Sequence, residues 1–296
     1  MRVLFTISLL LFIVSCTQKS EDLAEKDQDV VEKIDGHPYP KIPTQMMLFG
    51  NSIEIDNFDI KERLDKEVIV NTYYHSSTVQ ILKRANRYFP LIEKVLAEEG
   101  MPDDMKYLCV IESALRQATS PTGAKGFWQF MPATAKDYGM RITSDVDERL
   151  DVEKSTRAAC DYMKDANRKF DDWIMAAASY NCGVRGLNLY VQSQGIDNFF
   201  ELHLNHETSR YVFRILALKL LMESPEDYGF FPLKMELYEP VEVKQIEVNT
   251  SISSLSDWAL ENGSNLHMVK VLNPWLIGNS LTISGGRTYS IALLKK

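Results

Sequence analysis

Residues 112–135 have the sequence ESALRQATSPTGAKGFWQFMPATA, which is unusual in composition. A glutamate, Glu112, ends an apolar helical segment, and a loop rich in Gly and Ser follows it. The loop leads into an aromatic segment with a single amide, Gln129. Because burial disfavours the charged form, a carboxyl group in apolar surroundings has a raised pKa and can donate a proton near neutral pH. A lone glutamate at a helix end is more often simply solvated, so composition alone only nominates Glu112 as a candidate acid.

Apolar residues at helical spacing flank this stretch on both sides. Before it, the spacing predicts a helix over 77–99, a stop at Gly100 and a second helix that opens at Pro102 and carries Glu112 near its end. After it, the spacing predicts helices over 132–138, 152–170, 172–180, 184–192 and 208–222. Strand-like alternation is absent from the sequence over 77–222. The sequence therefore predicts a helical globular domain, which we place at 45–232.

The end of the chain has a different pattern. Residues 241–248 alternate apolar and polar side chains, which predicts a strand. Two short helices are expected over 255–261 and 266–272, and a closing strand over 288–293. The predicted fold class is therefore mainly α, with a small α+β segment at 241–296.

The start of the chain has the features of a secretory signal. Arg2 precedes an apolar run over 3–14 that is too short to span a membrane, and Ser15-Cys16 follows. The ending Ile-Val-Ser-Cys resembles a bacterial lipobox, in which Cys16 becomes the acylated first residue; the alternative is a plain signal peptide. We assign 1–16 to a lipoprotein signal peptide and the polar, acidic residues 17–44 to a linker. Thr17 favours anchoring at the outer membrane, facing the periplasm.

Charge and cysteine content narrow the class of protein further. The net charge of -8 over 296 residues disfavours nucleic acid as a partner, since nucleic acid requires a basic face. It does not exclude a neutral sugar polymer. Apart from Cys16, the chain has Cys109, Cys160 and Cys182, an odd number that leaves any disulfide pairing open. Cys109 and Cys182 are expected to act as small apolar helix residues.

Four segments, in order, resemble the signature motifs of a known family. They are Glu112-Ser113, SPTGAKGFWQFMP at 120–132, ASYNCG at 178–183 and ETSRYV at 207–212. Together they are similar to the lytic transglycosylases, which share the goose-type lysozyme fold, and are closest to the membrane-bound D type. The likeness covers about residues 75–225. It implies a lysozyme-like helical catalytic domain at these positions.

The resemblance also implies roles for individual residues. Glu112 would be the single acid/base, supported by Ser113. The remaining candidates would bind substrate: Gln129 and Met131 in the groove, Tyr180 and Asn181 at the carboxylate or an N-acetyl sugar, and Tyr211 closing the pocket. Core packing is the alternative for Tyr180 and Tyr211, and Trp128 is expected in the core.

Two departures from the family pattern stand out. Arg116-Gln117 occupies the place where the family commonly has Asn-Pro, which leaves the shape of the loop open. Cys182 replaces the alanine of the usual Tyr-Asn-Ala-Gly motif, a small-for-small change that puts a thiol near the site.

The reaction that the resemblance implies is cleavage of the bond between N-acetylmuramic acid and N-acetylglucosamine in peptidoglycan, with 1,6-anhydromuramoyl ends and without metal or cofactor. Most glycosidases use two carboxylates, whereas the motifs here supply only Glu112. Two alternatives stay open: a hydrolytic muramidase of the same fold, and a non-catalytic peptidoglycan-binding lipoprotein. The expected partners are glycan strands and, through the lipid anchor, a membrane. The segment 241–296 weakly resembles a LysM-like glycan-binding module, with a structural cap as the alternative.

The lipobox yields a direct prediction. Cys16→Ser should release the protein from membranes without loss of activity, because the acyl chains can no longer attach. Membrane fractionation of cells that express either form measures this. A Cys16→Ser protein that stays with membranes after signal cleavage would place the anchor elsewhere in the chain.

Overall fold

The computed structural model describes residues 33–34, 37–38, 40–232 and 236–295. The signal peptide 1–16, with Cys16, and most of the linker 17–44 lie outside the described residues. Within the described ranges, no helix has both the length and the apolar character needed to cross a membrane.

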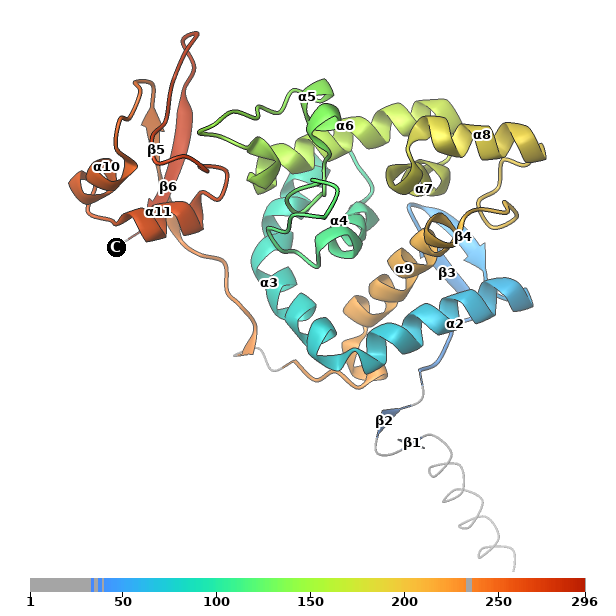
Figure 1. The fold of residues 1–296 in the computed structure, drawn as a ribbon. Helices are drawn as coiled ribbons and strands as arrows, with labels where there is room; N and C mark the ends of the chain where they lie inside the picture. Colours follow the sequence, from blue (N-terminus) through green and yellow to red (C-terminus); the bar gives the residue numbers. More distant parts are fainter. Residues whose placement is uncertain (1–32, 35–36, 39, 233–235, 296) are drawn as a thin grey trace, which may run out of the picture.

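Helices build most of the described chain (Figure 1). Two antiparallel strand pairs come first: β1 (Lys33–Ile34) with β2 (His37–Pro38), and β3 (Gln45–Leu48) with β4 (Asn51–Glu54). The helices that follow are α2 (Phe58–Tyr73), α3 (His75–Glu98), α4 (Lys106–Ser113), α5 (Pro132–Asp137), α6 (Val152–Phe170), α7 (Trp173–Cys182), α8 (Val184–Gln194) and α9 (His206–Glu223). Short 3-10 turns lie at Asp103–Met105, Glu148–Leu150 and Pro225–Tyr228. The chain ends with β5 (Val243–Val248), α10 (Leu255–Glu261), α11 (Leu266–Leu272) and β6 (Tyr289–Leu294).

The predicted fold class is confirmed, and every helix expected from spacing is present. The largest difference in a helix start is at α4: Pro102 precedes the 3-10 turn Asp103–Met105, and α4 begins only at Lys106. The sequence reasoning missed the β3–β4 hairpin and α2. Helix α2 lacks a clean apolar stripe, because its buried face includes Glu67 and Thr72 beside Leu64 and Val68.

Helix α4 lies at the centre of the helical core. Its residues from Tyr107 to Ile111 are all buried, as expected for a helix that is apolar on every side. Trp128 is fully buried, as predicted, and its indole Nε1 donates to Thr156 Oγ1 at 2.9 Å. Cys109 is buried on α4 and Cys182 half-buried on α7; among the described cysteines, which include Cys160, no disulfide forms.

The C-terminal segment has its own apolar cluster, formed by residues such as Leu255, Val269 and Ile291. Val146, from the loop between α5 and α6, also belongs to this cluster. The same loop bonds the segment through its backbone: Asp147 N–H donates to Trp275 O at 2.9 Å, and Ile277 N–H donates to Asp145 O at 2.9 Å. We call this contact, between residues 141–147 and 275–282, the seam. The division into units at 45–232 and 241–296 remains our proposal.

The seam is packed tightly at Gly278, which yields a prediction. A Cβ atom at Gly278 would lie 2.8 Å from Asp145 Cα, too close for either backbone to stay in place. Gly278→Ala should therefore destabilise the fold by about 1–3 kcal/mol, the usual range for overpacking. Calorimetric unfolding of the purified variant measures this.

Gly186→Ala in α8 is the matched control. There the nearest atom to an added Cβ, Cys182 Cβ, is 3.8 Å away, an ordinary contact. This change should be neutral or stabilise by up to about 1 kcal/mol. Equal melting temperatures for the two variants would contradict a tightly packed seam.

Candidate active site

The backbone at the end of α4 sets the position of Glu112. Helix α4 stops because Ala114 adopts a left-handed conformation, with φ 51°, and Leu115 follows with φ 55°. Such conformations cost non-glycine residues of order 1–3 kcal/mol each and persist only where the surroundings enforce them. Here Leu115 is buried, and Arg84 Nη1 donates to Ala114 O at 2.7 Å. Glu112 therefore lies in the last turn of a buried helix whose end is fixed.

A cavity of about 270 Å³ lies beside Glu112. The end of α4 and the residues that follow it form one wall. The junction of α2 and α3 and one face of α9 form the others. The lining residues are Asn71, Ser77, Ile81, Val110, Ile111, Glu112, Ser113, Ala114, Arg116, Ala118, Arg214 and Leu218. Glu112 is the only acid among them, so a ligand in this cavity meets a single carboxyl group.

Glu112 is held by a tyrosine from α9. The Tyr211 hydroxyl, itself buried, donates to Glu112 Oε1 at 2.6 Å. Burial raises the pKa of Glu112 from its ordinary value of 4.5 to about 7, and the negative charge of Glu207 acts in the same direction. The Tyr211 hydrogen bond and the positive charge of Arg214 lower this pKa and so limit the rise. Glu112 can therefore both give and take a proton near neutral pH.

This raised pKa also links stability to pH. The folded protein holds the Glu112 proton more tightly than the unfolded chain does. Its contribution to stability is therefore complete below pH 4.5 and is lost as pH rises through about 7.

The Gly-rich loop after α4 folds on itself. Gln129 has φ 49°, and its Nε2 donates to Gly126 O at 2.8 Å and to Ala118 O at 3.2 Å. A side chain at Gly126 is excluded, because its Cβ would lie 1.9 Å from Arg149 O. The Gln129 amide thus bonds to two backbone carbonyls within the loop, which accounts for an amide at position 129. The clash with Arg149 accounts for a glycine at position 126.

Tyr180 and Asn181, on α7, connect this loop to α9. The Tyr180 hydroxyl donates to Trp128 O at 2.8 Å. Asn181 Nδ2 donates to Glu207 Oε1 at 3.1 Å, and its Oδ1 accepts a hydrogen bond from Thr208 Oγ1 at 2.8 Å. Among the described residues, neither side chain hydrogen-bonds to Glu112.

The structure thus brings together two of the predicted site residues, Glu112 and Tyr211. Ser113 lies in the same cavity wall, but its buried hydroxyl donates to Cys109 O at 3.2 Å. Met131 is 41% exposed at the start of α5, outside the residues that line this cavity. The substrate-binding roles of Ser113, Gln129, Met131, Tyr180, Asn181 and Tyr211 stay predictions.

Sequence reasoning missed Arg214 and the contribution of α2 and α3 to the cavity. The signal for Arg214 was available, because Tyr211, Arg214 and Leu218 follow the i, i+3, i+7 spacing that places side chains on one helix face. Asn71 and Ser77 carry no comparable signal, since they lie before the first of the recognised motifs.

The Tyr211 contact yields a titration prediction. Tyr211→Phe removes the hydrogen bond that favours ionised Glu112, so the pKa of Glu112 should rise above about 7. Carbon-13 NMR of the labelled glutamate carboxyls measures the shift. Tyr180→Phe is the matched control, because the Tyr180 hydroxyl donates to Trp128 O and not to Glu112. An unchanged or lowered pKa in Tyr211→Phe would contradict the role given to this hydrogen bond.

Two domain families match this chain. Residues 90–202 match the family described as transglycosylase SLT domain, and residues 244–296 match the soluble lytic transglycosylase C-terminal LysM-like domain. The chain therefore carries an SLT domain of lysozyme-like fold, followed by a LysM-like domain, as the sequence motifs indicated. Tyr211 lies beyond residues 90–202 and yet hydrogen-bonds to Glu112.

Curated relatives share similarity over a longer range. The chain is 29% identical over 236 residues to membrane-bound lytic murein transglycosylase D of Escherichia coli (strain K12), which covers 78% of this chain and 51% of that protein. It is 29% identical over 173 residues to membrane-bound lytic murein transglycosylase F of Desulfosudis oleivorans, covering 50% of this chain and 37% of that protein. The chain thus spans about half, or less, of the length of these relatives.

Proposed function

We propose that this chain is a peptidoglycan lytic transglycosylase. It would cleave the bond between N-acetylmuramic acid and N-acetylglucosamine and leave a 1,6-anhydromuramoyl end. The observation that carries the proposal is the single carboxyl group, Glu112, held by Tyr211 beside a cavity in an SLT domain. The relatives support it, since both are named as lytic murein transglycosylases.

The proposed mechanism uses Glu112 twice. Protonated Glu112 donates its proton to the glycosidic oxygen as the bond to the muramoyl carbon breaks. The acetamido group of the substrate stabilises the cationic centre that forms. Ionised Glu112 then takes the proton of the muramoyl 6-hydroxyl, whose oxygen closes the anhydro ring. The proton count balances without water, and a pKa of about 7 suits both steps.

Two groups beside Glu112 support its ionised form between these steps. Tyr211 donates a hydrogen bond to Oε1, and Arg214 contributes positive charge from the cavity wall. The Arg214 side chain is itself held, since its Nη2 donates to Ile111 O at 2.9 Å. Because these groups are fixed in advance, they need little rearrangement when the charge on Glu112 changes.

Hydrolysis by two carboxylates is the second candidate, and Glu207 is the observation that favours it. Glu207 is exposed in the first turn of α9, and its charge raises the pKa of Glu112. A second acid near the first could activate water. We favour the transglycosylase because Glu207 does not line the cavity and instead accepts a hydrogen bond from Asn181.

We further propose where the protein works and how it is held there. The names of the relatives support a membrane-associated protein of the cell envelope. The finer proposal is an acyl anchor on Cys16 at the outer membrane, with the enzyme facing the periplasm. Each buried acyl methylene would contribute roughly 0.8 kcal/mol to anchoring. In this arrangement the LysM-like domain at 244–296 would bind glycan next to the catalytic domain.

Substitution of Glu112 tests the proposed function. Glu112→Gln should lower the release of anhydromuropeptides from purified peptidoglycan by a factor of about 10²–10⁴, because an amide cannot transfer the proton. Liquid chromatography with mass spectrometry of the released fragments measures the rate, and a thermal melt checks that the variant is folded.

Glu207→Gln is the matched control, since it removes the neighbouring carboxylate and keeps its shape. This variant should retain anhydromuropeptide release within about tenfold, with a lower pKa for Glu112. A loss as large as that of Glu112→Gln would indicate a reaction that needs both carboxylates. Near-normal release by Glu112→Gln would overturn the assignment of the acid.

A further inference from the structure

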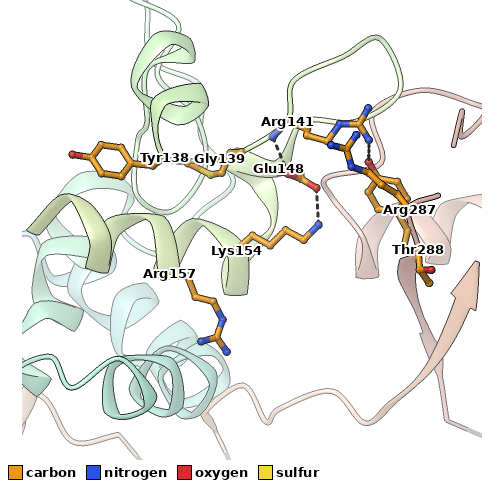
Figure 2. A pocket seen from close by; sticks show the side chains of 10 residues that line it. Tyr138, Gly139, Arg141, Glu148, Lys154, Arg157, Arg287 and Thr288 are labelled. Atoms are coloured by element: carbon orange, nitrogen blue, oxygen red, sulfur yellow. Dashed lines mark hydrogen bonds and ion pairs between the residues drawn. The ribbon is translucent and has the colours of Figure 1, made fainter. Parts of the chain in front are cut away.

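A second cavity, of about 470 Å³, lies beside the seam between the helical domain and the C-terminal domain. Residues of the loop after α5, of α6 and of the turn before β6 line it. Figure 2 shows Lys154 extending from α6 toward the C-terminal segment, which carries Arg287 and Thr288, while Arg157 points downward from α6 in this view. Both domains thus contribute walls to this cavity.

The cavity is positively charged, although the chain as a whole has a net charge of -8. Its lining includes the cations Arg141, Lys154, Arg157 and Arg287, and one acid, Glu148. A concave site whose lining carries a net positive charge attracts small anionic ligands.

Two of these cations are neutralised within the protein. Lys154 Nζ lies 2.6 Å from Glu148 Oε1. Arg157 forms ion pairs with Glu98, Glu99 and Glu153 at 2.6–3.0 Å. These side chains shape the cavity without offering a free charge.

The two arginines that remain come from opposite domains, and their charges are not compensated. The Arg141 guanidinium donates to the Tyr289 hydroxyl, a neutral group. Arg287 is exposed and, within the described ranges, forms neither a hydrogen bond nor an ion pair. A guanidinium presents a planar set of N–H donors that matches the two oxygens of a carboxylate.

The Tyr289 side chain, to which Arg141 donates, is held in place from both domains. The Tyr289 ring stacks on Trp275, with 5.3 Å between ring centroids, and Lys154 Nζ lies 5.2 Å from the Tyr289 centroid. Arg287 follows Gly285 and Gly286, which have φ 71° and 70° and form a turn that favours glycine. Arg141 is thus held by a hydrogen bond, whereas the Arg287 side chain is exposed at the edge of the cavity.

We propose that this seam cavity binds a carboxylate of the peptide stems of peptidoglycan, through Arg141 and Arg287. The inference rests on the proposed function, since it takes peptidoglycan as the substrate. Peptide stems are acidic branches on the otherwise uncharged sugar strand, and a cavity of about 470 Å³ has room for a few of their residues. A membrane surface is the weaker match, because anionic lipid attracts a broad basic face, whereas these cations lie in a concave site. The site would favour strands that still carry peptides.

Binding measurements test this proposal on the chain of 296 residues with Glu112→Gln, which separates binding from cleavage. The added change Arg287→Ala should weaken binding to purified sacculi by about tenfold, because a charge-assisted hydrogen bond is lost. Arg287→Glu should weaken it more, because its negative charge repels the carboxylate. Sacculi whose carboxyl groups have been converted to methylamides should bind all these variants equally. Stem peptides released from sacculi by an amidase should bind the parent chain and lose affinity with Arg287→Ala.

Arg168→Ala, at the far end of α6, is the matched control. Its side chain is 71% exposed, so its loss removes one positive charge from open surface and should leave binding unchanged. Unchanged binding of Arg287→Ala to native sacculi, or an equal loss on methylamidated sacculi, would overturn the proposal. The proposal would also be overturned if Arg287→Ala weakened binding to vesicles of anionic phospholipid and did not weaken binding to sacculi. Arg287-dependent binding by a wild-type chain that cuts no glycan would overturn the proposed function and leave this site standing.

Discussion

The hydrogen bond from Tyr211 to Glu112 is the contact on which the candidate site depends. It joins residues that are 99 positions apart, so it forms only when α9 packs against α4. Buried residues of α9, including Val212, Phe213, Ile215 and Leu216, supply that packing. A bidentate ion pair adds to it, since Arg210 donates to both oxygens of Glu67 on α2, at 2.6 and 3.0 Å. Burial of apolar surface and this partly buried ion pair together bring the Tyr211 hydroxyl to the Glu112 carboxyl group.

The same burial that positions Glu112 also changes its chemistry. A carboxyl group at the end of an apolar helix loses hydration, and its protonated form is favoured. A carboxyl group with no polar neighbour would rarely ionise and would be a poor base. Tyr211 and Arg214 counter this effect, because both favour the ionised form of Glu112. Left-handed backbone at Ala114 and Leu115 indicates that local strain is tolerated to hold this arrangement. The fold therefore loses some stability through backbone strain and gains an acid that works near neutral pH.

Much of the fold could be predicted from the sequence, because long helices such as α3 and α6 have a clear apolar face. The tail was predicted closely, since both of its short helices match the observed bounds. Helix α2 was missed because it buries Glu67, whose charge is paired with Arg210 of a distant helix. The β3–β4 hairpin was missed because its strands are short and partly exposed.

Part of the candidate site could be predicted from the sequence, and each residue was predicted for a different reason. The nomination of Glu112 needed only its apolar helix, whereas its partner Tyr211 was named through the family resemblance. The inward direction of the Gln129 amide depends on a positive φ that its residue type does not signal. The seam cavity could not be predicted, because it forms only where residues of two domains meet.

Digestion of purified peptidoglycan in water enriched in oxygen-18, followed by mass spectrometry of the fragments, tests the central claim most directly. If Glu112 serves in turn as acid and base for an intramolecular ring closure, the muramoyl ends will be 1,6-anhydro and will contain no oxygen-18 from the solvent. Reducing muramoyl ends that carry oxygen-18 would contradict the account, because water would then have been the attacking group.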